Sequence, residues 1–174
     1  VVSVPKSNKL IKLPSILEEE LSELLGLIFS DGMITNREIR FFNNDKNILN
    51  RCKQLFTSVF GVEPKEIQYN TVEGLKLDSA AVVKLIKAIG MPTKKKSNNV
   101  KIPSIIIRSP PSVIGAFLRG YFIGDGSFSK GVIEFCSSSK QLIQGLAYLL
   151  TRLGVLYSSI KEKERKYRLI ISSI

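Results

Sequence analysis

The sequence contains no histidine and no tryptophan, and only two cysteines. The missing histidine excludes Ser-His-Asp and Cys-His catalytic centres, histidine-ligated zinc and a histidine general base. Cys52 and Cys136 stand alone without CxxC spacing, which argues against a cysteine metal cluster and favours a reducing compartment. No apolar run approaches the ~18 residues that a transmembrane helix needs. We therefore expect no membrane partner and a cytoplasmic, intracellular location.

Acidic residues are scarce relative to basic ones. The 174 residues include 26 Lys and Arg against 15 Asp and Glu, which gives a formal net charge of +11. Hydrophobic residues make up 44% of the chain, enough for a core in one domain or two small ones. The chain begins with Val1, so we expect a piece of a longer protein. A cationic surplus of this size makes a polyanion the first expected partner.

Helical and strand patterns follow the same order in two halves. In the first half, the pattern predicts helices over 17–30, 46–60 and 80–89, and strands over 38–43, 66–70 and 74–78. The second half predicts helices over 112–123, with Ser109 as N-cap, and 140–153, and strands over 132–135, 155–160 and 167–172. The predicted fold class is α+β, with two pseudo-symmetric αββαββα repeats, the second lacking its last helix. Residues 1–100 form the first half, 101–111 a linker and 112–174 the second half.

The register of the two halves agrees. From Asp31, the inward-facing pair of the next strand lies 8 and 10 positions on, at Ile39 and Phe41. From Asp125, the same offsets give Ile133 and Phe135. Such agreement indicates an internal repeat.

Two segments at equivalent places carry the chemistry. They read LLGLIFSDG over 24–32 and LRGYFIGDG over 118–126, each a mainly apolar helix with a central glycine and a final Asp-Gly. The glycines let two such helices approach closely, so Asp31 and Asp125 would emerge side by side at one end. Two adjacent carboxylates repel unless a cation such as Mg²⁺ lies between them, and acids are also disfavoured at helix C-termini. Their placement therefore indicates function.

The two segments resemble the paired LAGLIDADG (dodecapeptide, DOD-type) motifs of homing endonucleases. The lead-in segments at 11–14 and 101–104 are most similar to those of endonuclease domains embedded in inteins. The resemblance implies a saddle of antiparallel sheets that binds and cuts double-stranded DNA at a long, asymmetric site. It also implies a monomer that uses Mg²⁺, with Mn²⁺ as a substitute.

The resemblance assigns roles to particular residues. Asp31 and Asp125 would be catalytic metal ligands, with help from the backbone carbonyls of Ser30 and Gly124. A lysine before the Ile-Pro of the second lead-in would lie near the scissile phosphate, and Lys101 matches it. Family members often place that lysine one position earlier, where this chain has Val100, and the lysines at 94–96 remain alternatives.

Strand alternation assigns the surface for DNA. The inward-facing residues are expected to be Ile39, Phe41, Ile67, Tyr69, Leu75 and Leu77 in the first half, and Ile133, Phe135, Tyr167, Leu169 and Ile171 in the second. Basic and amide side chains elsewhere suit phosphates and base edges. The expected DNA-binding residues are Arg40, Asn44, Gln68, Asn70, Lys76, Lys130, Lys161, Lys163, Arg165, Lys166 and Arg168.

One alternative has the same charge and the same sheets. A DNA- or RNA-binding relative of maturase or regulatory type would keep the fold without cleaving. The presence of both motif aspartates argues against it, because a protein that does not cleave has no need to bear their repulsion.

Overall fold

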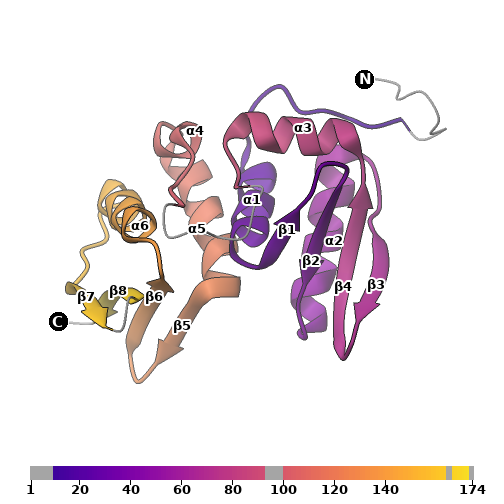
Figure 1. Ribbon diagram of the computed structural model, residues 1–174. Coiled ribbons are helices and arrows are strands. Elements are labelled where there is room, and N and C mark those ends of the chain that lie inside the picture. The colour runs from indigo at the N-terminus through magenta and orange to yellow at the C-terminus, as the bar shows by residue number, and fades with distance from the viewer. Residues whose placement is uncertain (1–9, 93–99, 164–165, 173–174) are drawn as a thin grey trace.

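The computed structural model describes residues 10–92, 100–163 and 166–172. Its elements, in chain order, are α1 (Glu19–Asp31), β1 (Gly32–Ile34), β2 (Glu38–Phe42), α2 (Lys46–Phe60), β3 (Lys65–Tyr69), β4 (Val72–Asp78), α3 (Ala80–Ile89), α4 (Ser104–Ile107), α5 (Pro111–Asp125), β5 (Gly126–Ser129), β6 (Val132–Ser137), α6 (Lys140–Arg152), β7 (Ser159–Lys163) and β8 (Lys166–Ser172). The two repeats lie on either side of the central α1–α5 pair (Figure 1). Among the described residues, no helix is long and apolar enough to cross a membrane.

Each repeat contains one four-stranded antiparallel sheet. The strand orders are β1-β2-β4-β3 and β5-β6-β8-β7. Every strand pair of the second sheet repeats a pair of the first at a constant displacement of 94 positions: the pair Phe41–Leu75 becomes Phe135–Leu169, and Glu66–Leu75 becomes Ile160–Leu169. The predicted fold class and internal repeat are thereby confirmed, and among the described residues no helix follows β8.

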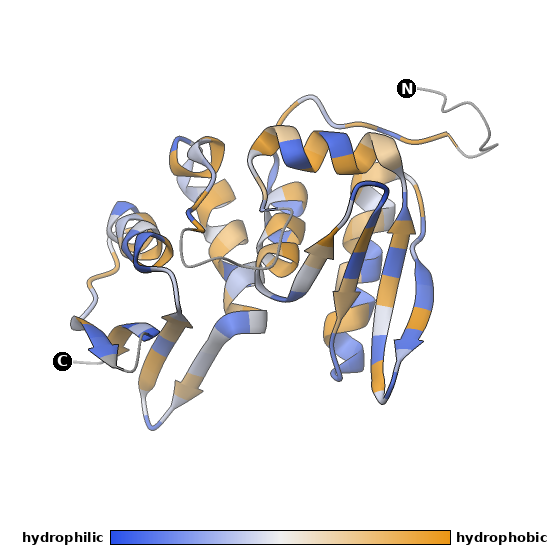
Figure 2. Cartoon of the chain, viewed as in Figure 1, coloured by the Kyte–Doolittle hydropathy of each residue, from blue (hydrophilic) through white to orange (hydrophobic). Residues whose placement is uncertain are grey.

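The two motif helices pack against each other through their glycines. A Cβ placed on Gly26 would lie 2.3 Å from the Phe117 carbonyl oxygen, and one on Gly120 would lie 2.1 Å from the Glu23 carbonyl oxygen. Neither position has room for a side chain, so backbone meets backbone at this crossing. Hydrophobic residues predominate along both helices in the hydropathy view (Figure 2), and the stretch of α1 from Leu21 to Ser30 is buried.

Local signals set the helix ends largely as predicted. The Asp45 carboxylate accepts a hydrogen bond of 2.8 Å from the Asn47 amide at the N-terminus of α2. Gly61 ends the same helix in the left-handed conformation, with φ of +68°. The Ser79 and Ser139 hydroxyls cap α3 and α6 in the same manner as Asp45.

Two local predictions are wrong. Ser109 does not cap α5: its hydroxyl donates to the Ile105 carbonyl at the end of α4, and α5 begins on Pro111 after Pro110. Proline suits that position because the first amides of a helix have no intrahelical acceptor. The strand predicted from 155 begins only at Ser159, because the chain first leaves α6 through a left-handed Gly154.

Candidate metal and nucleic-acid site

Asp31 and Asp125 end α1 and α5 at the same end of the helix pair. A Cβ placed on Gly124 would lie 2.1 Å from the Ser30 Oγ and 2.6 Å from the Asp31 Oδ2. The Asp31 carboxylate therefore lies against the α5 backbone one residue before Asp125. Only glycine fits at position 124 while the two acidic helix ends are this close.

The phenol of Tyr121 lies within electrostatic reach of both carboxylates. Burial is the main cause that raises the pKa of Tyr121, and the negative charges of Asp125 and Asp31 add to it. The hydroxyl is buried within reach of the Asp125 carboxylate, and this contact also favours the protonated phenol. Burial and the neighbouring negative charges therefore favour the protonated, neutral phenol. It also packs on Phe29 and Phe135, which close this side of the site to water.

The groups at the helix ends suit a hard divalent cation. Carboxylate oxygens are preferred ligands of Mg²⁺, and the last carbonyls of a helix, among them those of Ser30 and Gly124, have no intrahelical donor. The described residues contain no group of three or more His, Cys, Asp or Glu placed so that it could hold a metal ion by itself. A cation held here would complete its shell with water or phosphate oxygens, as Mg²⁺ commonly does.

A cleft of about 480 Å³ opens beside Asp125. Its walls include Val100, Cys136, Ser137 and Lys166. Lys101 is exposed and directly follows Val100, so its backbone lies at the edge of this cleft. Its contact with the scissile phosphate stays a prediction. The alternatives at 94–96 lie outside the described residues.

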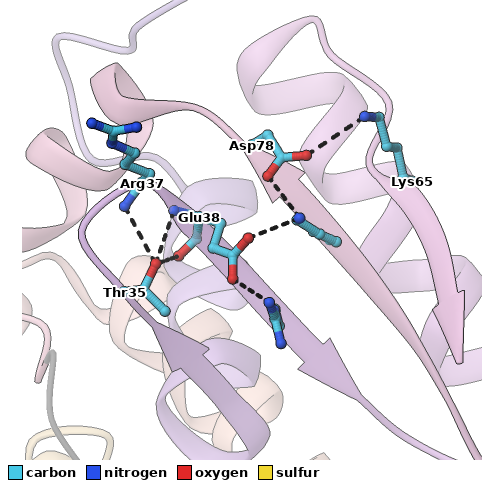
Figure 3. Close-up of polar contacts among 7 residues, drawn as sticks. Thr35, Arg37, Glu38, Lys65 and Asp78 are labelled. Atoms are coloured by element: carbon cyan, nitrogen blue, oxygen red, sulfur yellow. Dashed lines mark hydrogen bonds and ion pairs between the residues drawn. The ribbon is translucent and has the colours of Figure 1, made fainter. Parts of the chain in front are cut away.

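Arg40 and Lys76 share the uncovered face of the first sheet, hereafter its outer face. Both form ion pairs with Glu38, and Lys76 also lies 3.1 Å from Asp78 (Figure 3). The hydrogen bond from Lys76, followed by the charge of Arg40, holds the pKa of Glu38 below its usual value. Lys65 extends the network at 3.6 Å from Asp78. Each of these cations is thus paired with an acid on this sheet.

The predicted facing of β3 is wrong. Ile67 pairs with Gly74 and Tyr69 with Val72, which places both on the outer face, and Tyr69 is 66% exposed. Gln68, expected on the DNA-binding side, instead faces α2. Among the described strands, β3 lies at the edge of its sheet and pairs with β4 alone, so register with β4, and not apolarity, decides its facing.

The other expected DNA-binding residues are distributed over the second sheet, two hairpin turns and the loop after β2. Register puts Lys161, Lys166 and Arg168 on the outer face of the second sheet, where Arg168 pairs with Glu134 at 3.0 Å. Asn70 and Lys130 occupy left-handed hairpin turns, and Asn44 is exposed between β2 and α2. Lys163 lies on β7 opposite Lys166. Arg165 lies outside the described residues.

A buried charge cluster was not anticipated from the sequence. Glu23 on α1 is 2% exposed and accepts hydrogen bonds from Arg51 at 2.9 and 2.8 Å and from Arg119 at 2.8 Å. Those arginines hold the pKa of Glu23 below its usual value against the opposing effect of burial. The signal was present: an acid inside a helix that is apolar on every side needs a cationic partner.

Family comparison agrees with the interpretation of the motifs. Residues 112–174 match the family model described as "LAGLIDADG-like domain". The fold is similar to that of the homing endonuclease I-DmoI bound to DNA and Mn, with a TM-score of 0.68, 18% identity and coverage of 90% of this chain and 91% of that one. It is also similar to the N-terminal LAGLIDADG domain of DUF199/WhiA, with a TM-score of 0.61, 18% identity and coverage of 92% and 80%. The second repeat thus matches the model of that family, and the chain has the two-repeat LAGLIDADG fold.

Similar sequences occur inside much longer proteins. The chain is 35% identical, over 96% of its length, to part of an A-type ATP synthase subunit of Pyrococcus abyssi, and covers 17% of that protein. It is 33% identical, over 93% of its length, to part of a probable translation initiation factor IF-2 of Methanocaldococcus jannaschii, and covers 15% of it. The chain thus spans less than a fifth of the length of these relatives.

Proposed function

We propose that this chain is a site-specific endonuclease for double-stranded DNA that depends on a divalent metal. The observation that carries the proposal is the Gly124 contact, because it brings the Asp31 carboxylate against the helix end that holds Asp125. The DNA-bound structures of I-DmoI, which include Mn or Mg, support the same substrate class.

The chain's own residues have distinct tasks in this proposal. Asp31 and Asp125 hold a divalent cation, with the Ser30 and Gly124 carbonyls as further oxygen ligands. When bound, the cation polarises the phosphodiester and lowers the pKa of a bound water. Tyr121 stays protonated beneath the two carboxylates, and Lys101 sits at the margin of the Asp125 cleft to contact the scissile phosphate. The chain binds the duplex as a monomer, through the outer faces of both sheets and over a long asymmetric site.

We further propose that the chain is the endonuclease domain of an intein. A segment like it lies within an ATP synthase protein, an initiation factor, a DNA polymerase and the small subunit of replication factor C. These proteins share no reaction that one module of this size would serve. This distribution is explained if the segment is a module that carries its own DNA-cutting site and recurs in unrelated host proteins.

The test combines selection with cleavage. Duplexes bound by the chain are selected from a random library, then incubated with Mg²⁺, with Mn²⁺ or with a chelator. We expect double-strand cleavage only with a divalent ion, and its loss without loss of binding in Asp31→Asn and in Asp125→Asn. Cleavage that persists in both variants would overturn the assignment of the aspartates.

A second candidate is sequence-specific DNA or RNA binding without cleavage. The observation that favours it is Val100, a buried apolar residue that lines the Asp125 cleft where the resemblance often implies a lysine. Tight binding of a selected duplex, with no cleavage by the wild type in any divalent ion, would establish this candidate over the first.

A further inference from the structure

The outer face of the first sheet carries apolar residues where a DNA-binding surface is usually polar. Phe42, Gly74 and Ile67 form one row across β2, β4 and β3, and Val72 pairs with Tyr69 toward the hairpin turn. Phe42, Ile67, Tyr69 and Val72 are called the apolar patch below.

The Phe42 ring is built into this surface. It lies over Gly74, where a Cβ would fall 2.6 Å from the Phe42 Cδ1 and 2.9 Å from its Cε1. The Tyr69 ring tilts against Phe42, with centroids 6.3 Å apart, and remains 66% exposed. With Gly74 beneath the Phe42 ring and the Tyr69 ring beside it, these residues form an exposed apolar surface that a partner can contact.

The equivalent row of the second sheet has the opposite character. At the displacement of 94 positions, Phe42, Gly74 and Ile67 correspond to Cys136, Arg168 and Lys161. The fold does not require apolar residues here, because the second sheet has the same register with two cations in that row. The two repeats therefore present different chemistry to a ligand that spans both.

The neighbouring row identifies the kind of ligand. Arg40, Lys76 and Lys65 lie beside the apolar patch on the same face, and the chain carries a net charge of +11. Cations beside an apolar patch match the major groove of DNA, where phosphates flank base edges and the C5-methyl of thymine is the apolar group of the bases.

We propose that the apolar patch contacts thymine methyl groups, so that the first repeat selects a thymine-containing half-site. The second repeat contacts its own half-site through the cations that occupy the equivalent row. This inference rests on the proposed DNA-binding function. Phe42 and Tyr69 are its specificity-determining residues: Tyr69 makes the exposed contact, and the Phe42 ring beside it supports it. Removal of one contacted methyl should weaken binding about fourfold, as expected for one buried carbon.

The experiment uses duplexes selected by the full chain from a random library. Each thymine of a selected duplex is replaced in turn by deoxyuridine, which removes only the C5-methyl. We expect one or two replacements, confined to one half-site, to weaken wild-type binding about fourfold each, and the same replacements to leave binding by Tyr69→Ser unchanged. The salt dependence of Tyr69→Ser should equal that of the wild type, because no phosphate contact is lost.

Controls separate this inference from the proposed function. Tyr148→Ser makes the same change at a 53% exposed tyrosine on α6 and should retain the wild-type response to deoxyuridine. Phe42→Leu keeps an apolar group over Gly74, so this variant should fold. We expect its binding to respond less to deoxyuridine than that of the wild type. Selected duplexes that tolerate deoxyuridine at every position would overturn this inference alone. Failure to enrich any sequence would overturn the proposed function as well.

Discussion

Arg119 on α5 donates a hydrogen bond of 2.8 Å to Glu23 on α1, across the contact between the two repeats. Arg51 on α2 binds the same carboxylate through two of its nitrogens. One acid thus joins three helices close to the glycine crossing. The equivalent position in the second repeat is Phe117, so the second repeat has no acid at this place.

Replacement of this acid tests its contribution to stability. Glu23→Gln should lower the free energy of unfolding by about 2 kcal/mol at pH 7, since charge-assisted hydrogen bonds are lost inside the fold. The folded-state pKa of Glu23 lies below its ordinary value of 4.5, so the stabilisation is full above that pH. It is lost as the pH falls through the lower folded-state value.

Urea unfolding at several pH values measures both effects. The difference between wild type and Glu23→Gln should shrink steadily below pH ~4.5. Glu19→Gln, at an exposed acid of the same helix, is the control and should change little. A difference between wild type and Glu23→Gln that stays constant down to pH 2 would contradict the assignment.

Glycines at the helix crossing should tolerate no side chain. Gly120→Ala is expected to cost about 1–3 kcal/mol of stability, because its Cβ would meet the Glu23 carbonyl oxygen. Gly115→Ala is the matched control on the same helix, where nothing lies within 4 Å of the new Cβ. It should gain about 0.5–1 kcal/mol from helix propensity. Thermal unfolding of the two variants measures the contrast, and equal effects would refute the close crossing.

Cations on the outer face of the second sheet should set the salt dependence of DNA binding. If Lys161 and Arg168 contact phosphates, each change to Ala should reduce the log–log salt slope by about 0.9. Lys84→Ala, on the exposed side of α3, should leave the slope unchanged. Titrations of a labelled duplex at several salt concentrations give the slopes. A wild-type slope near zero would remove these residues from the DNA-binding surface.

Acids on opposite faces of the first sheet offer a second test of which face binds DNA. Glu38 lies on the outer face with Lys76, whereas Glu73 pairs with Gln68 on the side facing α2. Glu38→Gln should strengthen duplex binding about fivefold at low salt, as it removes a charge that repels phosphate. Glu73→Gln changes the net charge equally and should have a smaller effect. Equal gains in affinity would mean that the outer face is not the contact surface.

Much of the central architecture follows from local rules that the sequence displays. The motif glycines and the Asp-Gly ends predict close helices with adjacent acids, and the matching register of the two halves predicts that both have the same arrangement. Asp45 and Gly61 mark the ends of α2 through chemistry that acts within a few residues. Such features need no knowledge of the tertiary fold.

The facing of β3 could not be obtained from alternation alone. Ile67 and Tyr69 are apolar, yet an edge strand takes its facing from its partner, and Gly74 opposite Ile67 lies on the outer side. The repeat itself held the missing signal: the equivalents of Ile67 and Tyr69 are Lys161 and Lys163 on β7, residues unsuited to a core. Glu23 escaped prediction because its partners come from two other helices.

The central claim is that Asp31 and Asp125 form one metal site shared by the two repeats. The most direct measurement is calorimetric titration of Mn²⁺ into the chain bound to a selected duplex with a non-hydrolysable linkage at the scissile position. Wild type, Asp31→Asn and Asp125→Asn are compared under the same conditions. A shared site predicts that either substitution alone weakens uptake of the ion at that site by at least tenfold while duplex binding persists. Uptake equal to that of the wild type in either single variant would contradict a site built from both aspartates.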